Sequence, residues 1–170
     1  MKKLILGVAA LALSVSAAAP AQAVSPTTQA TASAKIYRPL TITETQNLSF
    51  GTIVLNAGTW SGEVVSMTQA GVLTCGGGVN VTCSGTPTSA GYNLVGTNNA
   101  VVTVSSPGFN LVGPGGATLA FTPNAPATVN LGATGSTTGA SFGIGGSITL
   151  ASTTVDGVYT GTFNVTANYQ

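Results

Sequence analysis

The sequence predicts an all-β protein built as an antiparallel β-sandwich, and three observations support this prediction. Beyond residue 23, no stretch shows the sustained 3.6-residue apolar period of an amphipathic helix. Short runs in which apolar and polar residues alternate are frequent, and Gly, Ser, Thr, Asn and Pro separate them. The chain also ends on a long alternating segment. Its 170 residues are enough for one domain.

Charged residues are scarce. The chain has four Lys or Arg, three Asp or Glu and no His, so that 4% of it is charged, against about 25% in a typical globular protein. A basic patch for phosphates is missing, which argues against nucleic-acid binding. No His is present for general base catalysis or zinc ligation. We therefore expect a protein that is not an enzyme and that needs no cofactor or metal.

Residues 1–23 have the pattern of a secretory signal peptide. Lys2 and Lys3 precede an apolar run, residues 4–15, and Ala21-Gln22-Ala23 is a small-x-small cleavage site. The alternative is a transmembrane anchor, but the apolar run is shorter than the roughly 20 residues that a span needs. No later segment is long and apolar enough to cross a membrane. Export through the periplasm to the cell surface or medium is therefore expected.

The mature chain, residues 24–170, is divided into an N-terminal extension or first strand (24–36) and a β-sandwich domain (37–170). In the first part Ala30, Ala32, Ala34 and Ile36 alternate with small polar residues and Lys35. Leu40 and Ile42 continue the alternation after Pro39. Further strands are expected at 48–50 with 53–55, 60–67, 129–131, 141–144 and 147–150. Two β-hairpins are expected at 92–104 and 109–121, each with a Gly-, Asn- or Pro-containing turn.

Two cysteines, Cys75 and Cys83, flank a glycine-rich loop. In an exported chain this pair predicts one local disulfide. A free reactive thiol is the alternative, whereas a metal site would need more ligands than two thiols.

The C-terminal segment has the clearest pattern. Tyr159, Gly161, Phe163, Val165, Ala167 and Tyr169 occupy one face of an extended chain. Thr160, Thr162, Asn164, Thr166 and Asn168 occupy the other. This alternation predicts a β-strand with one buried face.

These features resemble chaperone–usher pilus subunits, which end on an alternating strand with a penultimate Tyr and a Gly fourteenth from the end. Tyr169 and Gly157 stand at those positions. The sequence is also similar to spore-coat-U-like proteins and to a family of small exported bacterial β-sandwich proteins. The segments that carry this similarity are 39–43, 48–53, 145–146 and 157–163.

The resemblance implies an immunoglobulin-like sandwich that lacks one strand, with a groove beside the C-terminal strand (residues 157–169). A periplasmic chaperone would fill the groove first, and the N-terminal extension of another subunit would replace it at an outer-membrane usher. Ala30, Ala32, Ala34 and Ile36 are then the candidate donor face. The other interpretation makes residues 30–42 the first strand of a complete sandwich. The local Cys75–Cys83 pair departs from the pilin pattern.

We therefore expect an exported structural subunit that assembles with copies of itself or related subunits by β-strand addition. The alternative is a monomeric β-sandwich that binds a carbohydrate or surface ligand, with Trp60 or Tyr92 stacking on sugars, although a core position is favoured for both. Glu44 and Glu63 are a formal carboxylate pair for glycoside hydrolysis. Nothing in the sequence brings them together, and solvated surface positions are favoured.

Overall fold

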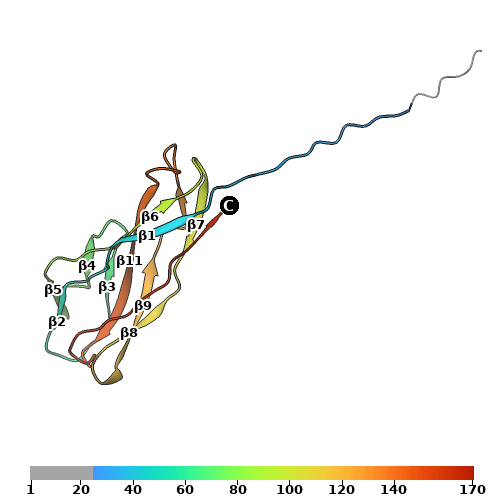
Figure 1. The fold of residues 1–170 in the computed structure, drawn as a ribbon. Helices are drawn as coiled ribbons and strands as arrows, with labels where there is room; N and C mark the ends of the chain where they lie inside the picture. The colour runs from blue at the N-terminus through green and yellow to red at the C-terminus, as the bar shows by residue number, and fades with distance from the viewer. Residues whose placement is uncertain (1–24) are drawn as a thin grey trace, which may run out of the picture. The chain divides into compact units, whose positions relative to one another are not determined.

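A computed structural model describes residues 25–170 (Figure 1). The predicted signal peptide lies outside these residues. The chain divides into two units, 1–35 and 36–170. The described part of the first unit, residues 25–35, has no helix or strand, whereas the second unit holds all the strands. Among the described residues no helix has the length and apolarity that a membrane crossing requires.

The second unit is all-β with antiparallel pairing throughout, an arrangement consistent with the predicted β-sandwich. A single 3₁₀ turn, Pro114–Gly116, is the one helical element of residues 25–170. The strands are β1 (Thr41–Gln46), β2 (Thr52–Leu55), β3 (Ser61–Met67), β4 (Leu73–Cys75), β5 (Val81–Ser84), β6 (Ala90–Val95), β7 (Val101–Ser105), β8 (Phe109–Val112), β9 (Thr118–Asn124), β10 (Thr128–Asn130), β11 (Ala140–Ala151) and β12 (Thr166–Tyr169).

The largest sheet has the order β1-β6-β11-β3-β4, and β9 also pairs with β11 and β8 with β9. Strand β11 is its longest member. Its first part pairs with β6, and its second part pairs with β3 and β9. The glycines of this strand allow side chains and backbone atoms of other segments to lie close to its backbone. A Cβ atom on Gly146 would lie 2.3 Å from Cζ of Phe121, so the phenylalanine ring needs a glycine there.

Two smaller sheets complete the domain. One has the order β10-β7-β12, and the other is the two-stranded ribbon β2-β5. The main core clusters lie toward different ends of the domain. One is centred on the buried Leu94, Val102 and Leu131. The other is centred on Val65, Phe121 and Ile148 and is flanked by many partly buried apolar side chains.

Several sequence predictions are confirmed. The hairpin at 109–121 is the β8–β9 pair, and strands occur close to residues 53–55, 60–67 and 129–131. The predicted strands at 141–144 and 147–150 are one continuous strand, β11. Gly145 and Gly146 do not interrupt it, because both lie in the middle of its ladder.

The predicted hairpin at 92–104 is wrong. Strand β6 pairs with β1 and β11, and strand β7 pairs with β10 and β12, so the chain changes sheets between them. The intervening turn bonds elsewhere: the amide of Gly96 donates to the carbonyl of Gly135, and the amide of Asn99 donates to the carbonyl of Gly132. These long-range bonds direct the turn toward the 132–135 loop instead of closing a hairpin.

The predicted strand at residues 30–36 is also absent. Residues 25–40 form no ladder with any other described segment, and the side chain of Ile36 is 86% exposed. An alternating pattern needs a partner edge to become a strand, and the described chain supplies none there. The first strand begins only at Thr41.

Candidate groove beside the C-terminal segment

The C-terminal segment shows the predicted alternation in burial. Tyr159, Phe163, Val165, Ala167 and Tyr169 are all partly buried, and the residues between them are exposed. Its hydrogen bonding is less regular than predicted. A regular ladder exists only for β12, which pairs with β7, and the earlier part makes a single bridge from Thr160 to Val112 of β8. The segment is therefore paired along one edge only.

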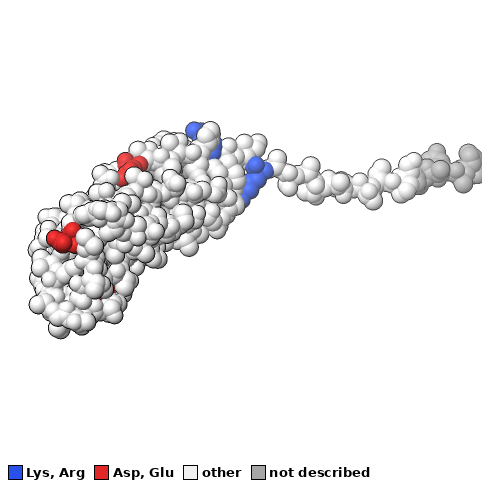
Figure 2. Space-filling model, turned by 90° about the horizontal axis from the view of Figure 1, so that it is seen from below, with Lys and Arg blue, Asp and Glu red and all other residues white. Residues whose placement is uncertain are grey.

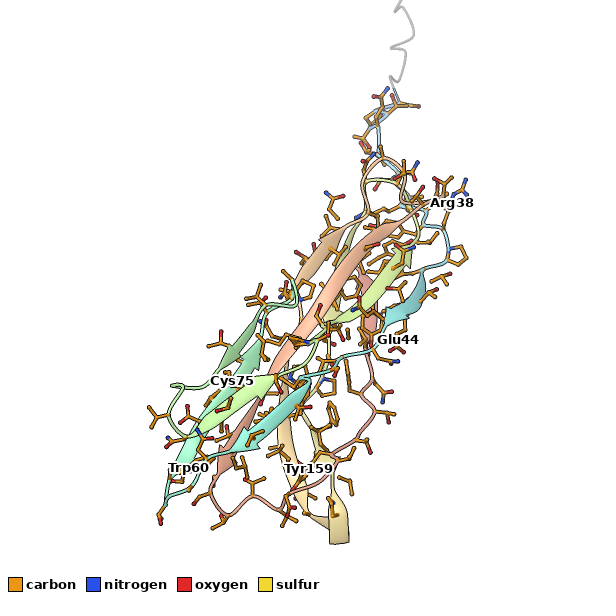
Figure 3. The ribbon with its side chains drawn as sticks, turned by 90° about the vertical axis from the view of Figure 1, so that its left-hand side faces the viewer. Arg38, Glu44, Trp60, Cys75 and Tyr159 are labelled. Carbon is orange, nitrogen blue, oxygen red and sulfur yellow. A yellow bond between two sulfur atoms is a disulfide. The ribbon has the colours of Figure 1, made fainter. Side chains whose placement is uncertain are left out.

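A groove with a volume of about 970 Å³ runs along this segment. Residues 154–163 form one wall, and residues 47–55, which include β2, form the other. Side chains of β8, β9 and β11 line it between the walls, among them Leu111, Leu119 and Ile148. Figure 3 shows the labelled Tyr159 at this end of the domain, far from Arg38.

Four phenylalanines make an aromatic floor. The ring of Phe109 lies 5.0 Å from that of Phe121 and 5.4 Å from that of Phe163, between ring centroids. The ring of Phe50 meets Phe121 edge-on at 6.0 Å. All four side chains line the groove. The rims are apolar too, since Val54 is 51% and Val158 is 78% exposed.

The backbones of the two walls are not paired with each other. Strand β2 pairs with β5 alone, and the opposite wall has only its bridge to β8. Among the described residues no ladder joins the two walls. Unpaired strand edges above an apolar floor are the features that an added β-strand uses, because its backbone pairs with the edges while alternate side chains enter the floor.

Two glycines of the C-terminal segment keep its wall close to the rest of the domain. Gly157 has a φ of +134°, which L side chains rarely adopt, and a Cβ atom there would lie 2.3 Å from Cγ of Pro114. A Cβ atom on Gly161 would lie 2.7 Å from Cε2 of Phe109. A larger residue at Gly161 would therefore displace the aromatic floor.

The predicted disulfide is present. Cys75 and Cys83, with Cα atoms 5.9 Å apart, join β4 of the largest sheet to β5 of the ribbon. The bond thus ties the wall that contains β2 to the rest of the domain. Asn80 reinforces the same loop, because its Nδ2 donates to a carboxylate oxygen of Glu63 at 2.7 Å.

Glu63 also accepts a hydrogen bond from the backbone amide of Gly77. The bond from Asn80 and then this one lower the pKa of the Glu63 carboxyl. Glu44 lies on β1 and lines the groove instead. The two carboxylates lie on strands β1 and β3, which β6 and β11 separate in the sheet, so the arrangement gives no support to a glycosidase-like pair.

The far end of the C-terminal strand is closed. The hydroxyl of Tyr169 donates to the carbonyl of Arg38 and accepts from the amide of Thr97, at 2.9 and 2.8 Å. The ring of Tyr37 stacks on Tyr169 with centroids 4.2 Å apart, and its hydroxyl donates to the carbonyl of Gln170. Tyr169, predicted as a groove residue, therefore fastens the start of the domain instead of lining the groove.

The other residues predicted for the site lie partly in the groove and partly in the core. Phe163, Tyr159, Gly157 and Gly161 line the groove, whereas Val165 and Ala167 pack in the other core cluster. Trp60 is partly buried and donates to the carbonyl of Asn56, and Tyr92 is 8% exposed and stacks on Phe142.

Ala30, Ala32 and Ala34 lie in the segment without secondary structure. The sequence analysis missed Tyr37 and Asn80, whose roles depend on distant partners.

A family model matches residues 40–169. The chain belongs to this family, described as a domain of unknown function, DUF4402. The matched residues include both walls of the groove, its floor and the disulfide, but not residues 24–36. Searches of curated proteins and of solved structures found no match.

Proposed function

We propose that this protein is an exported, non-catalytic structural subunit that assembles by β-strand addition into a surface filament or a surface or matrix layer. Its fold is then an immunoglobulin-like, pilin-like sandwich that lacks one strand. The observation that supports this best is the groove between residues 47–55 and 154–163, with its aromatic floor and its two unpaired edges. A missing strand would leave this combination of features.

The N-terminal extension, residues 24–36, supplies a suitable strand. Its described residues, 25–36, are outside the domain's ladders, and its alternating small and apolar residues, Ala30, Ala32, Ala34 and Ile36, would face the floor. A periplasmic chaperone would protect the groove before assembly, and an outer-membrane usher would direct the exchange, as the resemblance to pilus subunits suggests.

The scarcity of charge agrees with this role. Figure 2 shows a few acidic and basic side chains that stand apart on a surface without other charged residues. Charged residues at strand edges are a common protection against edge-to-edge pairing. Here both walls offer apolar rim side chains, Val54 and Val158, and so leave the edges accessible.

The test compares the mature chain, residues 24–170, with a chain that lacks residues 24–36. On unheated gels and by size exclusion we expect ladders from the mature chain that disappear on heating and are absent from the truncated chain. Clean monomers of both forms would contradict the proposal and favour the alternative, a monomeric module that binds a carbohydrate or surface ligand.

A matched pair of variants tests the groove itself. Phe163→Asp places a carboxylate on the aromatic floor and should abolish assembly or folding. Asn164→Asp adds the same charge at the next residue, whose side chain is exposed, and should leave both unchanged. Equal assembly of the two variants would show that the groove is not used.

A further inference from the structure

The loop that follows β11 contains the one aspartate of the chain. This residue, Asp156, precedes Gly157, whereas no asparagine of the chain precedes a glycine. The pair is chemically special, because a backbone nitrogen attacks the preceding carboxyl carbon most readily when its own residue has no Cβ atom to obstruct the approach. The product of that attack is a five-membered succinimide ring. Asp156 is therefore the residue of this chain best suited to a spontaneous rearrangement of the backbone.

The structure leaves both reacting groups accessible. Asp156 and Gly157 are exposed and lie in a loop without secondary structure. The backbone hydrogen bond of the Thr154 amide precedes this stretch, and that of the Thr160 amide follows it. In the described part of the chain, neither the carboxylate of Asp156 nor the amide of Gly157 has a hydrogen-bond partner. The nitrogen therefore breaks no hydrogen bond within the protein when it reacts.

The fold also requires the glycine that makes Asp156 reactive. Gly157 has a φ of +134°, and a Cβ atom there would lie 2.3 Å from Cγ of Pro114. A residue with a side chain would slow the attack, but it would be strained and would push Pro114 away. The packing of this loop thus keeps the reactive Asp-Gly order in place.

We propose that Asp156 is a modification site, at which aspartate isomerises spontaneously to isoaspartate. First the Gly157 nitrogen bonds to Cγ of Asp156, and one carboxyl oxygen leaves as water with the carboxyl proton and the amide proton. Water then adds to the main-chain carbonyl carbon of residue 156, and the bond from that carbon to nitrogen breaks. The main chain now runs through Cγ, and the former carbonyl is a free carboxylate. One water leaves and one returns, so the change needs no oxidant, reductant or cofactor.

The rearrangement lengthens the main chain by one carbon–carbon bond, about 1.5 Å. The loop is held on both sides of that point. The hydroxyl of Tyr159 donates to the carbonyl of Val155 at 2.8 Å, across residue 156. A Cβ atom on Gly113 would lie 2.6 Å from Cε1 of Tyr159, so this ring is closely packed, and Thr160 follows in its bridge to β8. We expect the added length to break the Tyr159–Val155 bond and to weaken the bridge.

The change falls on a wall of the groove, because Asp156, Gly157 and Tyr159 all line it. Conversion moves the negative charge to another atom of the main chain and loosens the wall at this end. If the groove accepts a strand, converted chains assemble less well than fresh ones. This last consequence rests on the proposed function, whereas the modification site does not.

The first test stores the full mature chain, residues 24–170, for several weeks at neutral pH. An isoaspartate-specific methyltransferase with a labelled methyl donor then marks isoaspartate, and mass spectrometry of peptides locates the mark. We expect it at residue 156. The matched control is Asp156→Glu, which keeps the charge but would have to close a six-membered ring, and it should lose the label. Asp156→Asn releases ammonia instead of water and should gain the label sooner than the wild type.

Two results would overturn the site. A folded wild type that stays unlabelled, while the same chain in urea becomes labelled, would show that the folded loop prevents ring closure. A label that persists in Asp156→Glu would place the reaction at an asparagine.

The second test examines the wall in stored and fresh chains. Amides 157–160 should exchange with solvent faster in the labelled chains, and unchanged exchange there would overturn the loosening of the wall. Stored wild type should also form fewer ladders on unheated gels than stored Asp156→Glu. Equal ladders from both would overturn the effect on assembly. An absence of ladders from fresh wild type would contradict the proposed function instead and would leave the methylation result as it stands.

Discussion

The two ends of the domain use similar side chains but are closed to different degrees. At the end that carries Tyr37 and Tyr169, the core residues Leu94, Val102 and Leu131 are at most 1% exposed, and strands cover them on both sides. At the other end Leu48, Phe50, Ile53 and Phe109 remain only partly buried around the groove. The open end does not lack apolar residues. Among the described residues no ladder joins β2 to the C-terminal segment.

This comparison yields a first prediction, with the largest expected effect. Leu94→Ala removes a fully buried side chain from the closed end and should lower the free energy of unfolding by about 3–5 kcal/mol. Leu111→Ala removes the same atoms from a partly exposed position that lines the groove, and should cost about 1–2 kcal/mol, because water already reaches that site. Urea unfolding of a chain lacking residues 24–36 measures both. Equal losses would mean that the two ends are equally closed.

A second prediction concerns the wall of the groove. Replacing both cysteines, Cys75→Ser with Cys83→Ser, should lower the free energy of unfolding by about 2–3 kcal/mol, as expected for so short a loop. The loss of stability should also be confined to the strands next to the disulfide. Because β2 and β5 pair only with each other, their amides should exchange with solvent faster, while those of β6 and β11 stay protected.

Reduction of the wild-type disulfide should reproduce the effect of the double replacement, which separates loss of the bond from loss of the sulfur atoms. Uniformly faster exchange across all strands would contradict the placement of the bond as a local tie of this wall.

The sequence was informative where a pattern depends on neighbours along the chain. The burial alternation from Tyr159 to Tyr169 follows from alternating side chains, and the Cys75–Cys83 bond follows from a short flexible loop. Pairing between strands that lie far apart in the chain was harder to predict from the sequence. The segments 92–96 and 109–113 are alike in sequence, yet only the turn after the second closes a hairpin, because β1 and β11 occupy both edges of β6.

The groove was expected only from the resemblance to pilus subunits. Its walls, residues 47–55 and 154–163, are separated by about a hundred residues, and what defines it is a ladder that the described chain does not form. Composition and periodicity report which side chains prefer burial. They do not report whether a neighbouring strand is available to bury them.

A third prediction concerns the fastening of the closed end. Tyr169→Phe keeps the ring that stacks on Tyr37 but removes the hydroxyl that bonds Arg38 and Thr97. The loss should be about 1 kcal/mol in the free energy of unfolding. Tyr159→Phe is the matched control, because its hydroxyl bonds only the nearby carbonyl of Val155 on an exposed loop. A larger loss for Tyr159→Phe would contradict the role assigned to Tyr169.

The smallest effect is expected from the pH dependence of the loop that holds the disulfide. The hydrogen bonds from Asn80 and Gly77 lower the pKa of Glu63 in the folded protein. A carboxyl whose folded pKa lies below its unfolded value contributes stability above the unfolded pKa, and this contribution is lost as the pH falls through the folded value. The loop should therefore loosen only under acidic conditions, at a pH below the ordinary pKa of a glutamate side chain.

The amide proton shift of Gly77, followed by NMR from pH 7 to pH 2.5, reports this titration directly, because that amide donates to the Glu63 carboxylate. In Glu63→Gln the shift should be flat, since the side-chain amide does not titrate in this pH range, although its single oxygen can accept only one of the two bonds. Glu44→Gln, a change in the groove, should leave the wild-type titration in place. A titrating Gly77 signal in Glu63→Gln would assign the pH response to another carboxyl and would remove Glu63 as the group that makes this loop sensitive to acid.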